Sequence, residues 1–289
     1  MSSECAQFQQ DLRQGQTKYG LFLNSGSTPV CHALSYSPYD WLLVDAQHSA
    51  IDCHTVLNNI TAAKANVQKH VMVRVASYND RAGIQFALDS GADGVLIPYI
   101  NHRQELEEAV SCCYYPHYVP NEGKSYHPEN KTIIKGTRSF GYPVPSMSKD
   151  GSDAYVKGTV KNLLIAFQVE TEDAIKNIND ILTVPGVDMA FLGPFDQCLS
   201  MGIYQAHGPQ EMFDTTEFQT KVVDTLSAAV AAQNKLITNE EHKILLGVFL
   251  LGNTRVSYYK SHGFRFIGLG ADIEHLLTTA KQYLSGVGK

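Results

Sequence analysis

Short runs of β-branched and aromatic residues recur along this chain, and segments with helical patterns separate them. Strands that alternate with helices in this way predict βα units around a parallel sheet rather than a sandwich. Eight such units in about 250 residues are typical of a TIM barrel. We therefore predict a single (β/α)8-barrel domain over residues 1–289, with strands at 18–23, 41–45, 71–75, 94–98, 163–170, 188–193, 245–251 and 265–269.

Some of the intervening helices carry recognisable signals. Asp80 can cap a helix, and Gly91 can end it. Thr171 precedes a second helix, whose first turn is acidic and therefore complements the positive helix end. A third amphipathic helix is expected before the seventh strand, from the spacing of Leu226, Ala229 and Val230.

Residues 114–150 interrupt this pattern, because they are rich in Pro, Gly, Tyr and Lys and too long for an ordinary connection. The segment carries more aromatic residues than a solvated linker would. We therefore expect a lid or a subunit contact rather than disorder. The aromatic set is Tyr114, Tyr115, His117, Tyr118, Tyr126, Phe140 and Tyr142.

Charge and cysteine content restrict the partners and the compartment. The net charge of −6 comes with scattered Lys and Arg, so a nucleic-acid partner is not expected. No apolar run reaches the ~20 residues that span a bilayer, and the N-terminus lacks the apolar region of a signal peptide. We expect a soluble, cytoplasmic protein that acts on small molecules and carries free, buried thiols at Cys5, Cys31, Cys53, Cys112, Cys113 and Cys198.

Polar residues at the ends of the second and third strands are the first site candidates, because TIM barrels place their active sites at the C-terminal strand ends. Asp45 could orient the imidazole of His48 as a general base. Alternatively, Asp45 caps the next turn and His48 bonds locally. Arg74 needs an anionic partner, which is either a substrate carboxylate or enolate, or a structural ion pair with Asp45 or Glu170.

The fifth and sixth strands end in carboxylates. Gln168 and Glu170 share one face of their strand, and Asp196 follows the turn made by Gly193 and Pro194. Two carboxylates without His or Cys neighbours favour Mg²⁺ or Mn²⁺. Alternatively, Asp196 is the N-cap of the next helix.

Seven short motifs then suggest a family. The order of DAQH, VMVR, GADGVLIPY, GTRSFGY, FQVE, GPFD and FIGLGAD over residues 20–276 resembles the HpcH/HpaI-type class II pyruvate aldolases. These are the 4-hydroxy-2-oxoheptanedioate aldolases, and macrophomate synthase is a relative. The resemblance implies a barrel of the phosphoenolpyruvate/pyruvate-domain type. It also implies a divalent cofactor, Mg²⁺ or Mn²⁺ with Co²⁺ as an alternative, and a 2-oxo acid substrate.

The resemblance also implies roles for individual residues. Glu170 and Asp196 match the metal ligands, Asp45 with His48 matches the base dyad, and Arg74 matches the arginine that meets the enolate oxygen. The backbone amides of Phe195 and Asp196 lie where the family binds the pyruvate carboxylate, at a helix N-terminus. The full set of expected substrate-binding residues is Gln168, Gly193, Pro194, Phe195, Asp196, Arg138 and Tyr155.

Three departures from the family pattern affect the substrate more than the metal. Gln47 stands where the family commonly has an acidic residue, so it removes a negative charge near the proposed base. Phe195 adds bulk beside the 2-oxo acid pocket, and Ser139 with Phe140 alters the motif after Arg138. The choice of the acceptor is therefore the property that transfers least directly.

Three functions are weighed. The first is a lyase that cleaves or forms 4-hydroxy-2-oxo acids through a pyruvate enolate and decarboxylates oxaloacetate. The second is a macrophomate synthase-like decarboxylase that joins the enolate to a large acceptor. The third is an inactive barrel that binds a metabolite.

The family resemblance further implies a homo-oligomer, a hexamer or trimer, in which C-terminal helices can be exchanged between subunits. Ile273, Leu276 and Leu277 could serve such an exchange. Alternatively, these residues cover the barrel's own sheet.

Overall fold

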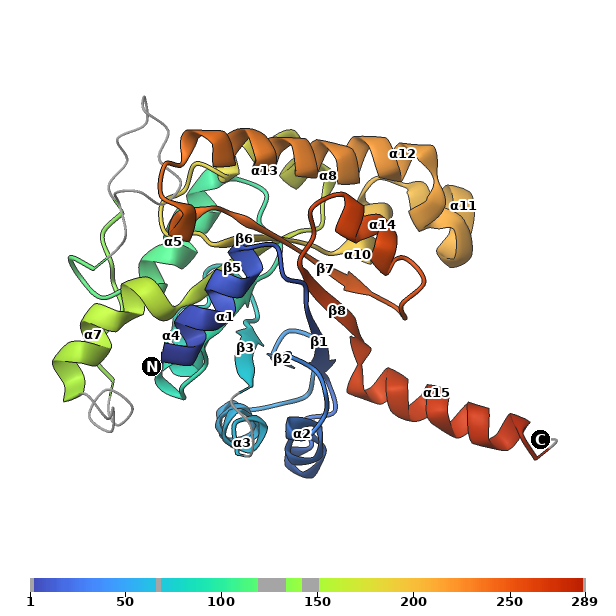
Figure 1. Cartoon of the computed structure of the whole chain (residues 1–289), viewed down its shortest axis with the longest axis horizontal. Helices are drawn as coiled ribbons and strands as arrows, with labels where there is room; N and C mark the ends of the chain where they lie inside the picture. Colours follow the sequence, from blue (N-terminus) through green and yellow to red (C-terminus); the bar gives the residue numbers. More distant parts are fainter. Residues whose placement is uncertain (1–2, 66–68, 119–133, 142–150, 288–289) are drawn as a thin grey trace.

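Eight parallel strands close into a barrel in which each strand pairs with the next and β8 pairs with β1 (Figure 1). The computed structural model describes residues 3–65, 69–118, 134–141 and 151–287. The predicted (β/α)8 fold is confirmed, and the strand boundaries agree within two residues. The strands are β1 Lys18–Leu23, β2 Trp41–Asp45, β3 His70–Arg74, β4 Gly94–Ile97, β5 Leu164–Val169, β6 Met189–Leu192, β7 Leu245–Leu250 and β8 Phe266–Ala271.

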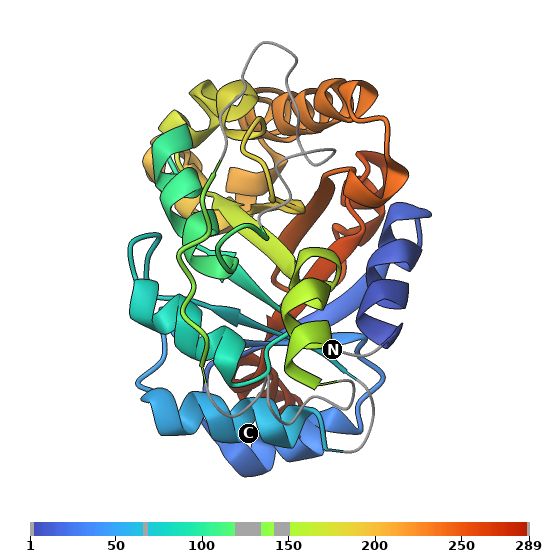
Figure 2. The same cartoon turned by 90° about the vertical axis from the view of Figure 1, so that its left-hand side faces the viewer.

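Helices form a ring around these strands (Figure 2). Their bounds are α1 Ser3–Arg13, α2 Thr28–Ser35, α3 Cys53–Ala63, α4 Arg81–Asp89, α5 Arg103–Cys113, α7 Gly151–Asn162, α8 Glu172–Lys176, α9 Ile178–Ile181, α10 Pro194–Ser200, α11 Ile203–Glu211, α12 Thr216–Phe218, α13 Thr225–Leu236, α14 Val256–Ser261 and α15 Asp272–Ser285. The chain also forms two 3-10 helices, η1 Met212–Asp214 and η3 Glu240–His242, and one π-helix among the described residues, η2 Gln219–Asp224.

The expected helix signals are present. The side chain of Asp80 accepts a hydrogen bond from the N–H of Gly83 at the start of α4, and Thr171 caps α8 in the same way. Gly91 follows α4 with a φ of +92°, a backbone conformation that glycine adopts readily. The apolar face of α13 is buried, as predicted, and it includes Leu226, Ala229 and Val230.

Two apolar layers stabilise the barrel, because alternate strand residues point inward and outward. The inner layer fills the barrel and is dominated by large side chains: Trp41 stacks on Phe266 with ring centroids 3.9 Å apart. Gly20 lies beneath this ring, where an added Cβ would come within 1.9 Å of Trp41. The outer layer packs the opposite strand faces against the helices. The interior is therefore a packed core rather than a channel.

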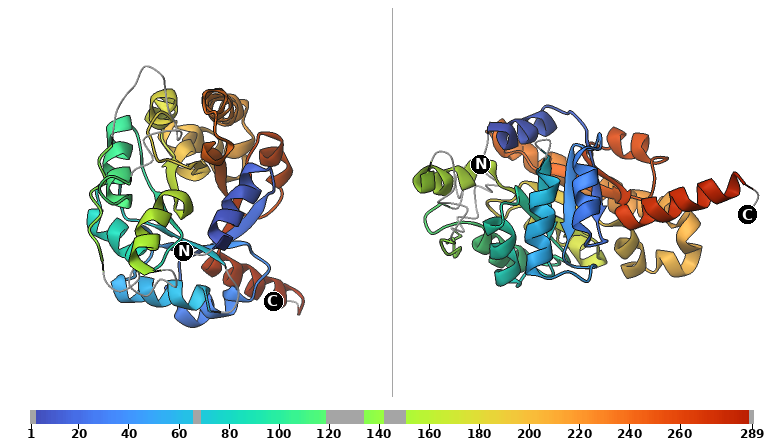
Figure 3. Two further views of the ribbon diagram at one scale, coloured as in Figure 1. Left: turned by 60° about the vertical axis from the view of Figure 1, so that its left-hand side comes forward. Right: turned by 90° about the horizontal axis from the view of Figure 1, so that it is seen from below.

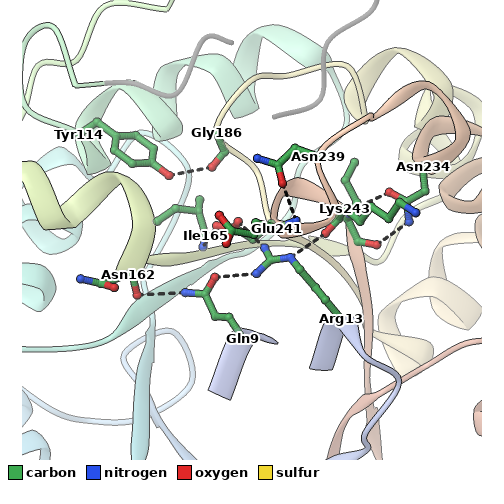
Figure 4. A network of polar contacts seen from close by, with 12 residues as sticks. Gln9, Arg13, Tyr114, Asn162, Ile165, Gly186, Asn234, Asn239, Glu241 and Lys243 are labelled. Carbon is green, nitrogen blue, oxygen red and sulfur yellow. Dashed lines mark hydrogen bonds and ion pairs between the residues drawn. The ribbon is translucent and has the colours of Figure 1, made fainter. Parts of the chain in front are cut away.

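Helix α1 packs on the N-terminal end of the barrel through Phe8 and Leu12, and Figure 4 shows the polar contacts that its residues Gln9 and Arg13 make there. Arg13 forms an ion pair with Asp188 at 2.9 Å and donates to the carbonyl of Lys243 and the side chain of Gln9. Gln9 in turn donates to the carbonyl of Asn162 at 3.0 Å. Leu12 and Phe8 of α1 pack against the inner layer, so α1 closes the barrel axis at this end, and a cavity of about 300 Å³ lined in part by Arg13 and Lys243 lies beside the helix.

The long segment at 114–150 leaves the fold at that same closed end. Helix α5 starts after the C-terminal end of β4, so it returns the chain to the N-terminal end before the segment begins. Tyr114 and Tyr115 are buried there, and residues 134–141 run along α4. The lid alternative stays a prediction, because most of the segment, residues 119–133 and 142–150, lies outside the described residues. A subunit contact stays a prediction, and Tyr126 and Tyr142 lie outside the described residues.

Helix α15 projects away from the barrel (Figures 1 and 3). Its apolar side chains are exposed, with 43% for Ile273 and 58% each for Leu276 and Leu277. The expectation that these residues cover the barrel's own sheet is therefore wrong. The helix leaves an apolar face without cover from the described part of this chain.

Two smaller expectations concern membrane spans and thiols. Among the described residues, no helix has the length and apolar content needed to cross a membrane. Cys31, Cys112, Cys113 and Cys198 are free and buried, as expected. Cys53 is free but exposed, which corrects the prediction for that residue, because it occupies the exposed first turn of α3.

Candidate active site

A cavity of about 270 Å³ opens at the C-terminal end of the barrel. It is lined by Phe22, Asn24, His48, Arg74, Gln168, Phe191, Gly193, Pro194, Phe195, Asp196 and Phe249. The strand ends of a TIM barrel converge at this face, so residues distant in sequence meet here. Seven residues selected from the sequence lie in its wall: His48, Arg74, Gln168, Gly193, Pro194, Phe195 and Asp196.

Arg74 and Asp45 form a buried pair at the last positions of β3 and β2. The Nε and Nη2 atoms of Arg74 donate to the two carboxylate oxygens at 2.8 and 2.7 Å. Burial alone would raise the pKa of Asp45, but the hydrogen bonds and charge of Arg74 hold it below its ordinary value. Of the two alternatives for Arg74, the ion pair with Asp45 is present.

Arg74 still has a donor available for another group. Its Nη1 atom lies 3.5 Å from the Oε1 atom of Gln168, at the long limit for a hydrogen bond, and the side chain lines the cavity. The guanidinium also lies over the ring of Phe22, 5.3 Å from the centroid. The structural ion pair and a contact with a ligand are therefore compatible.

The arrangement of His48 differs from the expected dyad. The Oδ1 atom of Asp45 accepts hydrogen bonds from the backbone N–H groups of Gln47 and His48, at 3.1 and 3.4 Å. Asp45 therefore caps the turn that follows β2. Among the described contacts, none joins this carboxylate to the imidazole of His48. The physical reason is competition, because Arg74 occupies both carboxylate oxygens. His48 is exposed and faces the cavity without this orienting partner.

Asn24 is a cavity residue that the sequence reasoning missed. Its side-chain amide donates to the Oδ2 atom of Asp45 at 2.5 Å. Its backbone N–H donates at 2.8 Å to the buried side chain of Asp272, the first residue of α15. The sequence did offer a signal, because Asn24 is a polar residue at the C-terminal end of a strand. The same criterion identified Asp45 and Glu170.

Glu170 lies directly after β5 and is almost fully buried, at 3% exposure. Burial, together with the like charge of nearby Asp196, raises the net pKa of its carboxyl to about 7. The backbone N–H of Tyr99, at 2.7 Å from Oε1, and the charge of Arg74 act in the opposite direction. The sequence analysis did not identify Tyr99 as a residue that contacts this carboxylate. It adopts a φ of +57°, a strained conformation for a non-glycine residue that aims its N–H at the carboxylate.

Asp196 occupies the first turn of α10, and Gly193 rather than Asp196 is the N-cap residue. The alternative that Asp196 is a helix cap is therefore wrong. Because Gly193 has no side chain and Pro194 follows it, no side chain caps this helix end. The backbone N–H groups of the first turn remain available to an anion.

The surroundings of Glu170 fit a hard divalent cation. An added Cβ on Gly193 would come within 2.7 Å of Gln168 Nε2 and 3.0 Å of Glu170 Oε2, so the glycine keeps these groups close to the backbone. Among the described residues, no group of three or more His, Cys, Asp or Glu side chains is arranged so that it could hold a metal ion. The candidate set is therefore two carboxylates, which matches ions that retain water or substrate oxygens as ligands.

Arg138 and Tyr155 lie elsewhere. Arg138 pairs with Asp89 at 2.7 Å and donates to the Tyr155 hydroxyl at 3.1 Å, and its guanidinium lies 4.7 Å from the ring centroid of Tyr115. Asp89 ends α4, at the end of that helix remote from the cavity. Neither residue lines the cavity, so the expected substrate contacts of Arg138 and Tyr155 are not supported in this chain.

Comparisons with known proteins agree with the fold and the motifs. A hydroxypyruvate/pyruvate aldolase of Paraburkholderia phytofirmans is 27% identical over 277 residues, covering 96% of this chain and 95% of that protein. A 4-hydroxy-2-oxo-heptane-1,7-dioate aldolase of Shigella sonnei is 26% identical over 282 residues, covering 97% and 94%. The structure of macrophomate synthase superposes with a TM-score of 0.75 at 21% identity, covering 98% of this chain and 88% of that one. This last likeness shows a shared fold.

The family profile supplies the identity. The profile described as HpcH/HpaI aldolase/citrate lyase matches residues 18–279, which include all eight strands and every residue that lines the cavity. The resemblance expected from the seven motifs is thereby confirmed. This chain belongs to the HpcH/HpaI aldolase/citrate lyase family.

Proposed function

We propose that this protein is a divalent metal-dependent carbon–carbon lyase that acts on 2-oxo acids through a pyruvate enolate. The observation that carries the proposal is the grouping of Glu170, Asp196 and Arg74 beside one cavity. Two adjacent carboxylates suit Mg²⁺ or Mn²⁺, and a buried guanidinium with a spare donor suits an enolate oxygen. Membership of an aldolase family supports the same chemistry.

The site residues have complementary roles in this proposal. Glu170 and Asp196 would hold the divalent cation, which would supply positive charge next to the enolate. The free amides at the start of α10 bind the substrate carboxylate. The Nη1 atom of Arg74 donates to the carbonyl oxygen, and Asp45 fixes the guanidinium in place.

His48 is the proposed base. In the cleavage direction it accepts the proton of the 4-hydroxyl group, the C3–C4 bond breaks, and the electron pair of that bond remains on the pyruvate fragment as the enolate. The hydroxyl-bearing fragment leaves as an aldehyde, and protonation of the enolate at carbon gives pyruvate. Decarboxylation of oxaloacetate produces the same enolate and requires no proton acceptor.

The proposal is tested by pyruvate release from oxaloacetate, with and without Mg²⁺ or Mn²⁺. We expect metal-dependent turnover in the native chain and its loss in Glu170→Ala and Arg74→Ala. Glu172→Ala is the matched control, because that carboxylate is half exposed on α8 and pairs only with Lys176 among the described residues. Turnover no greater than that of the metal alone would contradict the proposal and favour a barrel that binds a metabolite.

A second candidate function shares the enolate but uses a large acceptor, as the macrophomate synthase-like alternative requires. The aromatic wall of the cavity, with Phe22, Phe191, Phe195 and Phe249, favours it. Condensation with aldehydes separates the two functions. Rapid oxaloacetate decarboxylation without turnover of any aldehyde would favour the second.

We also propose a homo-oligomer assembled through α15, a hexamer or trimer located in the cytoplasm. The exposed Leu276 and Leu277 support the assembly, and the free thiols are typical of a reducing compartment. Light scattering of the double variant Leu276→Lys, Leu277→Lys should give a smaller assembly than that of the native chain. Leu236→Lys on α13 is the control, and an unchanged mass in the double variant would contradict the role of α15.

A further inference from the structure

A second cavity, of about 160 Å³, adjoins the first one. Pro194, Phe195 and Phe249 line both cavities, so the two share part of their wall. The second cavity extends from there toward the connection between β7 and α14 and toward η1. We call it the apolar pocket, and its further wall residues are Phe213, Leu250, Leu251, Gly252, Arg255 and Tyr259.

The wall of the apolar pocket is uncharged except at Arg255. That guanidinium donates to both carboxylate oxygens of Asp214, at 2.9 and 2.6 Å, and lies 5.3 Å from the ring centroid of Phe213. The bidentate pair offsets its charge. An incoming carboxylate would therefore have to displace Asp214 or lose its hydration without a new partner, and both are unfavourable.

The size of the pocket suits a ring. An apolar cavity of about 150 Å³ is sufficient to bind benzene. Tyr259 and Leu250 are buried in the wall, at 1% and 5% exposure, whereas Leu251 is 55% exposed at the rim. A planar or branched apolar group can enter past this rim and be covered by aromatic side chains.

From this geometry we propose that the apolar pocket binds the side chain of the aldehyde that the enolate adds to or that cleavage releases. The preferred aldehyde is neutral and aromatic or branched aliphatic, and carboxylated aldehydes are disfavoured. The inference rests on the proposed lyase function and specifies its acceptor class. It makes Leu251 and Phe213 specificity-determining residues, since they line the apolar pocket and not the first cavity.

A matched pair of aldehydes tests the inference. Benzaldehyde and 4-carboxybenzaldehyde have the same ring and differ by one carboxylate. With pyruvate and Mn²⁺, we expect the native full-length chain to condense benzaldehyde with at least about a tenfold higher kcat/KM. Leu251→Lys adds an unpaired cation at the rim and should lower this ratio at least fivefold.

Leu236→Lys is the control variant, because Leu236 is similarly exposed at 48% but lies at the end of α13 away from both cavities. It should keep the native ratio. A native chain that uses both aldehydes equally, or a ratio that falls as much in Leu236→Lys as in Leu251→Lys, would overturn the inference. So would a chain that decarboxylates oxaloacetate but condenses neither aldehyde.

The outcome separates this inference from the proposed function. Oxaloacetate decarboxylation, measured on the same native preparation without aldehyde, reports on the enolate site alone. If it is absent, the proposed function fails and the acceptor assignment fails with it. If it is present and the aldehyde ratio does not respond to Leu251→Lys, only the acceptor assignment fails.

Discussion

The two ends of the barrel each contain a buried arginine–aspartate pair, and the two pairs differ in how far the arginine is used in contacts within the chain. At the closed end, the Nε, Nη1 and Nη2 atoms of Arg13 donate to the Lys243 carbonyl, to Gln9 and to Asp188 (Figure 4). At the open end, Arg74 gives two nitrogens to Asp45 and keeps Nη1 toward the cavity. Both arginines line cavities, of about 300 Å³ for Arg13 and 270 Å³ for Arg74. The difference is that all three nitrogens of Arg13 make short hydrogen bonds, whereas Nη1 of Arg74 has only a contact of 3.5 Å with Gln168.

The adjacent carboxylates extend this contrast. Asp188 accepts from Arg13 and, through Oδ2, from the backbone N–H of Ile165 at 3.0 Å. Glu170, by contrast, accepts a backbone N–H group and lies beside the like charge of Asp196. The pKa of its carboxyl is raised to about 7. The closed end satisfies its charges internally. The open end holds negative charge that a cation would stabilise.

Arg13→Ala should have the largest effect on stability. Removing one partner of a buried pair leaves Asp188 uncompensated, which costs about 3–5 kcal/mol of the free energy of unfolding. We expect a lower urea midpoint, but kcat/KM at a temperature where the variant is folded should stay near the native value. A loss of turnover in folded Arg13→Ala would contradict the assignment of this end as structural.

Arg74→Ala is the counterpart at the open end. Removing a donor to a developing oxyanion costs about 100- to 1,000-fold in kcat, so we expect that loss in oxaloacetate decarboxylation. Arg74→Lys keeps the charge but not the bidentate contact with Asp45, and should recover only part of the activity. If Arg74→Ala were destabilised like Arg13→Ala and retained native kcat, the two ends would be equivalent.

Glu170→Gln tests the raised pKa through stability. In the metal-free folded chain, Glu170 titrates at about 7 instead of its ordinary 4.5. Because the pKa is raised in the folded state, the group contributes its full stabilisation at a pH below the pKa of the unfolded state. That stabilisation is lost as the pH rises through the pKa of the folded state. Metal-free Glu170→Gln should therefore be more stable than native at pH 8, by about 3 kcal/mol at most, and similar at pH 5.

Urea denaturation in the presence of a chelator measures this difference at both pH values. Glu172→Gln, an exposed neighbour on α8, should show no such pH dependence. An equal free-energy difference at pH 5 and pH 8 for Glu170→Gln would contradict the raised pKa.

Asn24→Ala should have the smallest effect. It removes one hydrogen bond to Asp45, which is worth about 1.5–3 kcal/mol because the acceptor is charged. We expect about a tenfold lower kcat, with the metal affinity unchanged. Asn24→Asp would place a second carboxylate against Asp45 and should be worse than Asn24→Ala. Equal kcat in Asn24→Ala and native would limit Asn24 to a structural role.

The features that local pattern determines were predictable. The strand alternation places Gln168 on the inner face, and the ends of β3 and β5 place Arg74 and Glu170 near the mouth. Each of these conclusions needs only one strand and the rule that barrel strands are parallel. The fold followed for the same reason, since eight short runs are each recognisable alone.

The features that depend on competition between distant residues were not predictable. His48 is three residues from Asp45, but Arg74, 29 positions away, occupies that carboxylate. Arg138 lies within the long segment 114–150, and the composition of that segment does not predict where the arginine packs. Its partner Asp89 is 49 positions away on α4, so its location depends on where α5 returns the chain.

The central claim, that Glu170 and Asp196 together hold a divalent metal, is tested most directly by Mn²⁺ binding followed by electron paramagnetic resonance. We predict saturable binding to the native chain, weakened at least tenfold by Glu170→Gln and by Asp196→Asn, and unaffected by Glu172→Gln. Equal affinity in all four proteins, or no binding to the native chain, would contradict the account.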